Sequence, residues 1–256
     1  MRELNDYGIV ADLYDTYVPV DFDVQFFLNE AQKSQGEVLE LMSGTGRVSI
    51  PLLEAGVRLA CVDISAEMLA ILKEKLIRKG LEADLFQMDV CDLELSRQFD
   101  QVIIPFHSFA HITSPEDQRK ALERIRQHLA PGGTFICTLG NPAIRRQPVD
   151  GQLRLFRKYA LDQGSGTLLL WLLEKYNPAD DHIVETFEFF EEYDSQGLLR
   201  SKRLMELHFR LTGKAEFEAL AENAGFKVVS LFGDYSYSEF KHDTSPYLIW
   251  ILRRST

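Results

Sequence analysis

One stretch, Glu37–Ser65, constrains the fold of this 256-residue chain more than any other. A strand pattern containing Glu40 leads into a turn with Gly44 and Gly46. A helix pattern and a second apolar strand follow, and that strand ends at Asp63. Glycine lets a backbone turn sharply and approach a ligand closely. A carboxylate at the end of the second strand can accept hydrogen bonds from both hydroxyls of a ribose. The stretch therefore predicts half of a nucleotide-binding βαβ unit.

Strand and helix patterns continue to alternate up to residue 140, which is typical of a parallel sheet covered by helices. The expected strands are Val38–Met42, Arg58–Asp63, Ala83–Met88, Gln101–Pro105 and Thr134–Leu139. Three longer strand patterns separated by turn residues then predict an antiparallel sheet of three strands: Gly166–Tyr176, His182–Tyr193 and Leu198–Leu211. The last elements expected are a helix over Lys214–Asn223 and strands over Lys227–Phe232 and Tyr247–Arg253.

Charge and cysteine content narrow the class of partner. The net charge of −11 disfavours binding to the phosphate backbones of DNA or RNA, so no nucleic-acid partner is expected. Cys61, Cys91 and Cys137 lack metal-ligand spacing and are expected to be buried, reduced thiols, so no metal site is predicted. The first twenty residues carry no signal pattern and no apolar run reaches about 18 residues, so we expect a cytoplasmic protein that does not span a membrane.

Five features, in this order and spacing, resemble the class I S-adenosylmethionine (SAM) dependent methyltransferases. They are the Glu40–Gly46 turn, Asp63, Met88-Asp89-Val90 after the third strand, Phe99–Phe106 around the fourth, and Leu129–Gly133 before the fifth. Met42 stands where this family's motif has its first glycine. The pattern is similar to small-molecule methyltransferases of quinone biosynthesis, aminosugar biosynthesis and glycine N-methylation. It covers residues 35–140 and 212–253.

The resemblance implies an α/β fold with a doubly wound, seven-stranded, mostly parallel Rossmann-like sheet whose last strand is antiparallel. Residues 1–34 would form an N-terminal helical segment over the cofactor site. Residues 35–140 and 212–256 would form the SAM-binding core, and residues 141–211 an inserted β-rich lid around the substrate. The implied cofactor is SAM.

Roles at the nucleoside end of the cofactor follow from the same resemblance. Asp63 would accept hydrogen bonds from the ribose hydroxyls. Ile64 and Met68 would pack on the faces of the adenine, with plain core packing as the alternative for Met68. Asp89 would accept a hydrogen bond from the exocyclic amine of the adenine, and Val90 would donate its backbone N–H to the ring.

At the methionine end, the resemblance implies that Glu40 orients the turn and the cofactor's amino group, directly or through water. Gly44 would present its backbone to the cofactor, next to Met42. The carbonyl of Pro105 and the side chain of Phe106 would lie beside the methionine moiety. Tyr14, in the N-terminal segment, would close over the cofactor.

A general base would assist transfer to a protonated hydroxyl or amine, and histidine has a suitable unperturbed pKa. His107 and His111 follow the fourth strand, and His208 lies in the third lid strand. The alternative is that each is a surface or structural histidine. Four glutamates of the second lid strand are expected to form a solvated face: Glu185, Glu188, Glu191 and Glu192.

The leading hypothesis is a SAM-dependent methyltransferase that methylates an O or N atom of a small-molecule metabolite. The edges of its lid could pair across a two-fold axis in a homodimer. A nicotinamide dehydrogenase is disfavoured because Ser49 stands where its fingerprint needs a third glycine. A protein or nucleic-acid methyltransferase of the same fold is disfavoured because Ile104-Pro105-Phe106-His107 lacks the acidic or amide residue and second proline typical of amino-group enzymes. A non-catalytic SAM-binding protein is the remaining alternative.

Overall fold

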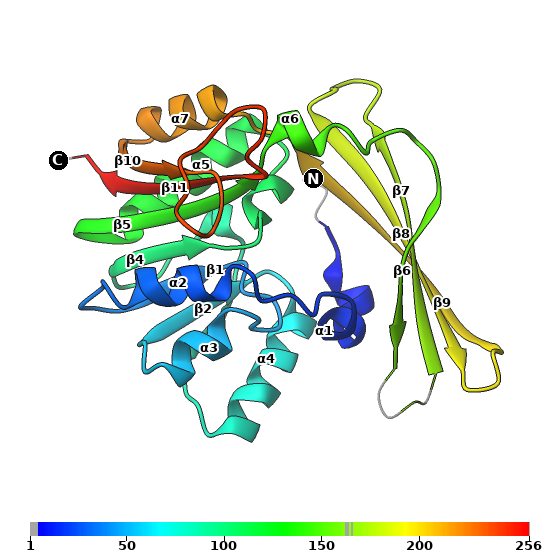
Figure 1. The fold of residues 1–256 in the computed structure, drawn as a ribbon. Coiled ribbons are helices and arrows are strands. Elements are labelled where there is room, and N and C mark those ends of the chain that lie inside the picture. The colour runs from blue at the N-terminus through cyan, green and yellow to red at the C-terminus, as the bar shows by residue number, and fades with distance from the viewer. Residues whose placement is uncertain (1–4, 162–163, 165, 256) are drawn as a thin grey trace.

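The computed structural model describes residues 5–161, 164 and 166–255, which form two β-sheets (Figure 1). The larger sheet has seven strands in the order β10-β11-β5-β4-β1-β2-β3. The strands are β1 (Val38–Leu41), β2 (Leu59–Asp63), β3 (Asp84–Gln87), β4 (Phe99–Ile104), β5 (Leu129–Gly140), β10 (Phe226–Phe232) and β11 (Tyr247–Arg254). β11 runs antiparallel to both of its neighbours, whereas β1 to β5 are mutually parallel. The predicted fold class is confirmed.

Helices cover both faces of this sheet. Those of the core are α2 (Val24–Ala31), α3 (Ser49–Glu54), α4 (Ala66–Lys79), η2 (Val90–Asp92), η3 (Ser108–His111), α5 (Pro115–His128) and α7 (Lys214–Asn223). Apolar residues of α2, α3 and α4 pack on one face, and those of α5 and α7 on the other. α4 begins where the Ser65 hydroxyl accepts a hydrogen bond from the Met68 N–H, so this start position is set by a local cap.

The second sheet is antiparallel and has the order β6-β7-β8-β9. Its strands are β6 (Arg154–Ala160), β7 (Gly166–Tyr176), β8 (Ile183–Asp194) and β9 (Leu199–Arg210). The expectation of three strands was wrong, because β6 is an additional edge strand. All of its side chains except that of Tyr159 are exposed, so it lacks the apolar alternation that marks a half-buried strand.

The N-terminal segment fills the space between the two sheets (Figure 1). It consists of the 3₁₀ helix η1 (Tyr7–Leu13) and the short helix α1 (Tyr14–Tyr17). Val10, Leu13 and Tyr17 are buried against apolar side chains of the second sheet, including Phe190. We call the second sheet the lid, because the N-terminal segment and the carboxyl ends of the core strands lie beneath it.

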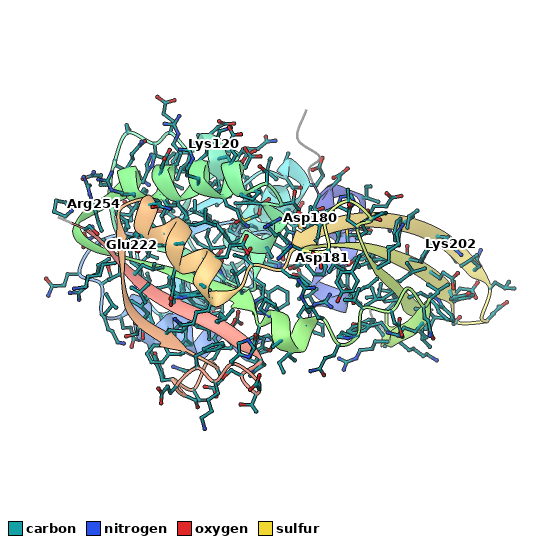
Figure 2. All side chains as sticks on the ribbon, turned by 90° about the horizontal axis from the view of Figure 1, so that it is seen from above. Lys120, Asp180, Asp181, Lys202, Glu222 and Arg254 are labelled. Carbon is teal, nitrogen blue, oxygen red and sulfur yellow. The ribbon has the colours of Figure 1, made fainter. Side chains whose placement is uncertain are left out.

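Polar contacts join the lid to the core where the chain passes from β9 to α7. Arg210, at the end of β9, donates hydrogen bonds to Asp180 in the β7–β8 loop and to Glu216 in α7. Figure 2 shows Asp180 and Asp181 at this junction and Lys202 at the far end of the lid. The helix α6 (Pro142–Arg145) lies where the chain passes from the core into the lid. There the guanidinium of Arg145 donates two hydrogen bonds to the carboxylate of Glu174 in β7. The lid is therefore anchored at one end.

The expectations for the cysteines and for membrane-spanning segments can be compared with the structure. All three cysteines are buried, as predicted from their positions near strands, and no disulfide joins any of them to another described residue. None of the helices within the described ranges is long and apolar enough to cross a membrane.

Candidate active site

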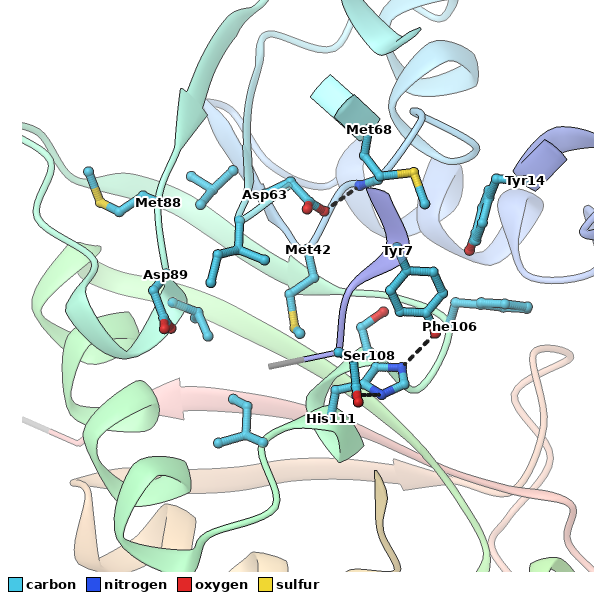
Figure 3. Close-up of a pocket in the computed structure, with 16 residues that line it drawn as sticks. Tyr7, Tyr14, Met42, Asp63, Met68, Met88, Asp89, Phe106, Ser108 and His111 are labelled. Carbon is cyan, nitrogen blue, oxygen red and sulfur yellow. Dashed lines mark hydrogen bonds between the residues drawn. The ribbon is translucent and has the colours of Figure 1, made fainter. Parts of the chain in front are cut away.

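A pocket opens where the carboxyl ends of β1, β2, β3 and β4 meet the N-terminal segment (Figure 3). Open α/β sheets place their ligands at this edge. Ten residues predicted for the site line it: Tyr14, Met42, Gly44, Asp63, Ile64, Met68, Asp89, Val90, Phe106 and His111. The other lining residues are Asn5, Tyr7, Val62, Met88, Ser108 and Ile112. Most of the site residues predicted from local patterns and from the resemblance therefore line one cavity.

Asp63 holds the loop segments around the pocket together. One carboxylate oxygen accepts a hydrogen bond from the Gly44 N–H at 2.7 Å, and the other accepts one from the Ser65 N–H at 2.9 Å. Burial raises the pKa of Asp63 from its ordinary value, and the backbone hydrogen bonds oppose that shift. Each carboxylate oxygen retains a further lone pair, so the side chain can still accept two hydroxyl groups from a ligand.

The turn after β1 uses backbone conformations that are rare outside glycine. Gly44 has φ of +56°, and no atom of the described residues lies within 4 Å of the place where its Cβ would stand. Met42, at the position of the family's first glycine, nevertheless adopts φ of +58°. Phe106 and His107, after β4, have φ of +55° and +62°. Such conformations in non-glycine residues cost energy and concentrate at functional sites.

The wall beneath β2 and β3 is apolar with one acidic group. Met68 is buried in the first turn of α4, whereas Ile64 is partly exposed. Asp89 caps η2 by accepting a hydrogen bond from the Cys91 N–H at 2.9 Å. Val90 follows at the start of η2 and also lines the pocket. These residues offer a ligand apolar contacts and one carboxylate acceptor.

Glu40 lies beneath the turn. It does not line the pocket, and its carboxyl accepts a hydrogen bond from the Ser49 hydroxyl at 2.6 Å. Burial raises the pKa of Glu40 to about 8, although the Ser49 hydrogen bond and the charge of Arg47 oppose the shift. The carboxyl is therefore largely protonated at pH 7 in the ligand-free protein.

His111 belongs to a hydrogen-bonded chain that ends at the pocket. The Asn5 side-chain oxygen accepts a hydrogen bond from the backbone N–H of His208, and its NH₂ group donates one to the His208 carbonyl. These two bonds fix the orientation of the amide. The same amide lies 2.6 Å from Nδ1 of His111, so Nδ1 is the acceptor and the proton of the neutral ring resides on Nε2. Nε2 faces the Tyr7 hydroxyl at 3.2 Å. Burial lowers the pKa of His111 to about 4, so the ring is neutral at pH 7.

Pro105, His107 and His208 do not line the pocket. Pro105 is buried at the end of β4. His107 stacks on Tyr247 with ring centroids 5.0 Å apart, and burial lowers its pKa to about 4. His208 pairs across the lid with Glu185, so its side chain lies on the opposite sheet face from Leu207, which packs on the N-terminal segment.

Sequence reasoning missed Tyr7, Asn5 and the ion pair between Arg47 and Asp23. The ion pair joins the glycine turn to the start of α2 through hydrogen bonds of 2.5 and 2.7 Å. Arg47 also lies over the ring of Phe106, 4.4 Å from its centroid. The one local signal for Tyr7 was its place in an aromatic stretch ahead of Tyr14, whereas the other contacts join distant parts of the chain.

The comparisons with known proteins agree with this geometry. Residues 38–133 match the family described as "Methyltransferase domain". A cypemycin N-terminal methyltransferase from Streptomyces is 35% identical over 41% of this chain and 42% of its own length. A glycine/sarcosine N-methyltransferase from Halorhodospira halochloris is 32% identical over 51% of this chain and 50% of its own length. The chain thus spans half or less of these two relatives.

The fold is shared over the whole chain with solved methyltransferases. The CcbJ methyltransferase from Streptomyces caelestis superposes with a TM-score of 0.85 at 24% identity and covers 100% of both chains. Residues 38–133 match a methyltransferase domain, and the resemblance to methyltransferases predicted from the sequence is confirmed. SAM is the cofactor of this class.

Proposed function

We propose that the whole chain is a SAM-dependent methyltransferase that methylates an O or N atom of a small molecule. The observation that carries the proposal is the Asp63 carboxylate, held by two backbone N–H groups and exposed to a pocket of matching chemistry. One relative named above is an N-terminal methyltransferase and the other an N-methyltransferase, which favours nitrogen as the methyl-accepting atom.

The residues present suit the cofactor. Open space beside Gly44 leaves room for a ligand against the backbone, and Asp63 retains acceptors for a ribose. Ile64, Met68 and Asp89 supply apolar faces and an acceptor for adenine. When bound, SAM supplies a methyl group on a sulfonium, a carbon already activated for displacement. The protein's main task is to align the reactants, which can remove roughly 7–11 kcal/mol of barrier.

Tyr7 and His111 enter the proposal as a positioning pair. Since Nδ1 of His111 accepts from Asn5 and Nε2 donates to Tyr7, the ring has no free nitrogen to act as a base. The Tyr7 hydroxyl, by contrast, can turn its own hydrogen towards the pocket (Figure 3). We propose that Tyr7 donates a hydrogen bond to bound ligand and that His111 orients it.

The first test is isothermal titration with SAM and with its demethylated product, followed by methyl transfer from labelled SAM to panels of small amines and alcohols. We expect micromolar binding, which corresponds to about −8 kcal/mol, and label in a small-molecule acceptor. The absence of both binding heat and thermal stabilisation would contradict the proposal. Cofactor binding without transfer to any acceptor would favour a non-catalytic SAM-binding protein.

A second prediction concerns Glu40 and pH. The ammonium of bound SAM would favour the ionised carboxylate, so the pKa of about 8 should fall on binding and a proton should be released. SAM affinity is then expected to rise between pH 6 and pH 7.5, below the titration of the cofactor's own amine at roughly 7.7–8.0. Titration at pH 6.5 in buffers of different ionisation enthalpy measures the proton release. An unchanged proton count in Glu40→Gln would refute the assignment.

A further inference from the structure

Glu188 is an acidic residue on the apolar inner face of the lid. Alternate residues of a strand point to opposite faces, so the four glutamates of β8 do not form one solvated face as expected. Glu185 and Glu191 lie on the outer face, where they form ion pairs with Lys175 and Lys202. Glu188 shares the inner face with Phe190, which packs on the N-terminal segment.

The surroundings of Glu188 leave its charge uncompensated. Its cross-strand neighbours are Leu172 and Met205, and its Oε2 atom is buried without a hydrogen-bond partner among the described residues. Two basic groups on this side of the lid are engaged elsewhere: Arg145 with Glu174, and Arg203 with Asp12 and Glu192. A carboxylate oxygen that is buried without a partner is costly when the group is ionised, which points to a ligand that supplies a partner.

A series of tyrosine rings runs from the pocket to Phe190, which lies two residues from Glu188 on the same face of β8. Tyr7, Tyr14 and Tyr17 form a series of edge-to-face contacts, with ring centroids 6.0 and 5.3 Å apart, and Tyr17 meets Phe190 at 4.9 Å. Burial raises the pKa of Tyr7 and of Tyr14, and the charges of Glu188 and Asp63 both add to each shift. Tyr7 and Tyr14 thus line the pocket together with Asp63, and Tyr17 continues the series to Phe190 on the face of the lid that carries Glu188.

The Glu188 carboxylate and the tyrosine rings are groups that bind organic cations. Aromatic faces attract organic cations, and a buried carboxylate forms a strong, charge-assisted hydrogen bond with an ammonium. We propose that Glu188 binds the protonated amine of the methyl acceptor, with the tyrosines around it, and that the acceptor is accordingly an organic amine. This inference rests on the proposed methyltransferase function.

The ionisation of Glu188 is consistent with such a ligand. Burial, together with the charge of Glu174, raises the pKa of Glu188 to about 7. A cation bound beside the carboxyl would stabilise its ionised form. Tyr17, whose hydroxyl is also buried without a hydrogen-bond partner among the described residues, offers a second acceptor for an ammonium with several N–H groups.

The test compares a cation with its neutral analogue on protein saturated with demethylated SAM. Benzylammonium and benzyl alcohol are titrated into wild type, Glu188→Gln and the outer-face control Glu191→Gln. We expect wild type and the control to bind benzylammonium at least about tenfold more tightly than the alcohol, and Glu188→Gln to lose this preference. Equal affinities of the two probes for wild type, or the same preference in Glu188→Gln, would overturn the inference.

A second measurement uses wild type alone, so its result does not depend on whether the Glu188→Gln variant folds. Nuclear Overhauser contacts between the benzylammonium methylene and tyrosine ring protons are expected, and contacts to other residues only would overturn the assignment. The two proposals fail differently. Wild type that does not bind demethylated SAM refutes the methyltransferase function, whereas intact cofactor binding without an ammonium preference refutes only the role of Glu188.

Discussion

Replacing Asp63 by alanine is expected to weaken SAM binding by about a hundredfold. A hydrogen bond to a charged group contributes about 1.5–3 kcal/mol, and the proposed contact has two of them, one to each ribose hydroxyl. Loss of roughly 3 kcal/mol corresponds to two powers of ten in the dissociation constant. The same substitution removes the acceptors for the Gly44 and Ser65 N–H groups, so the glycine turn also loses its anchor.

Isothermal titration of wild type, Asp63→Ala and Asp63→Asn measures this effect. The asparagine side chain retains one acceptor oxygen, so its affinity should fall between the other two. Glu74→Gln is a matched control, because Glu74 is an exposed acid on α4, away from the pocket lining. A dissociation constant for Asp63→Ala within threefold of wild type, in a variant that remains folded, would remove Asp63 from the cofactor site.

Asp63 and Gly44 were predictable from the sequence because their positions depend on neighbours in the chain. A strand, a glycine turn and a capped helix are local signals, and parallel strands bring their carboxyl ends to one edge. The helix over Lys214–Asn223 and the strand Gly166–Tyr176 were predicted with the bounds that the structure has. In these cases local propensity and the final packing favour the same conformation.

The remainder of the site depends on contacts between distant segments. Asn5 meets His208 across 203 positions of sequence, and no periodic pattern records that pairing. Glu188 is one of four glutamates in the same strand, and residue type alone does not distinguish it from the others. Its place on the inner face follows from the alternation of the strand together with the packing of Phe190. Met42 is a further case, since a methionine gives no indication of the left-handed backbone that it adopts.

The contact between Arg47 and Asp23 leads to the largest expected effect on stability. The Asp23 side chain is fully buried and that of Arg47 is 13% exposed, and two hydrogen bonds join them. Replacing Asp23 by alanine leaves the guanidinium buried without its carboxylate, which typically costs 3–5 kcal/mol. For a chain of this size that corresponds to a fall in melting temperature of about 6–20 °C. Calorimetry and urea unfolding measure it.

A paired substitution separates the loss of the ion pair from the loss of packing. Asp23→Leu combined with Arg47→Met removes both charges and retains apolar volume, so it is expected to recover most of the stability lost in Asp23→Ala. Glu54→Ala is the control, because its ion pair with Lys79 is about half exposed on both sides and should contribute at most about 1 kcal/mol. If Asp23→Ala costs no more than Glu54→Ala, the buried pair does not hold the glycine turn to the start of α2. Arg47 would then have to be positioned by its contacts with Phe106 and the Val20 carbonyl alone.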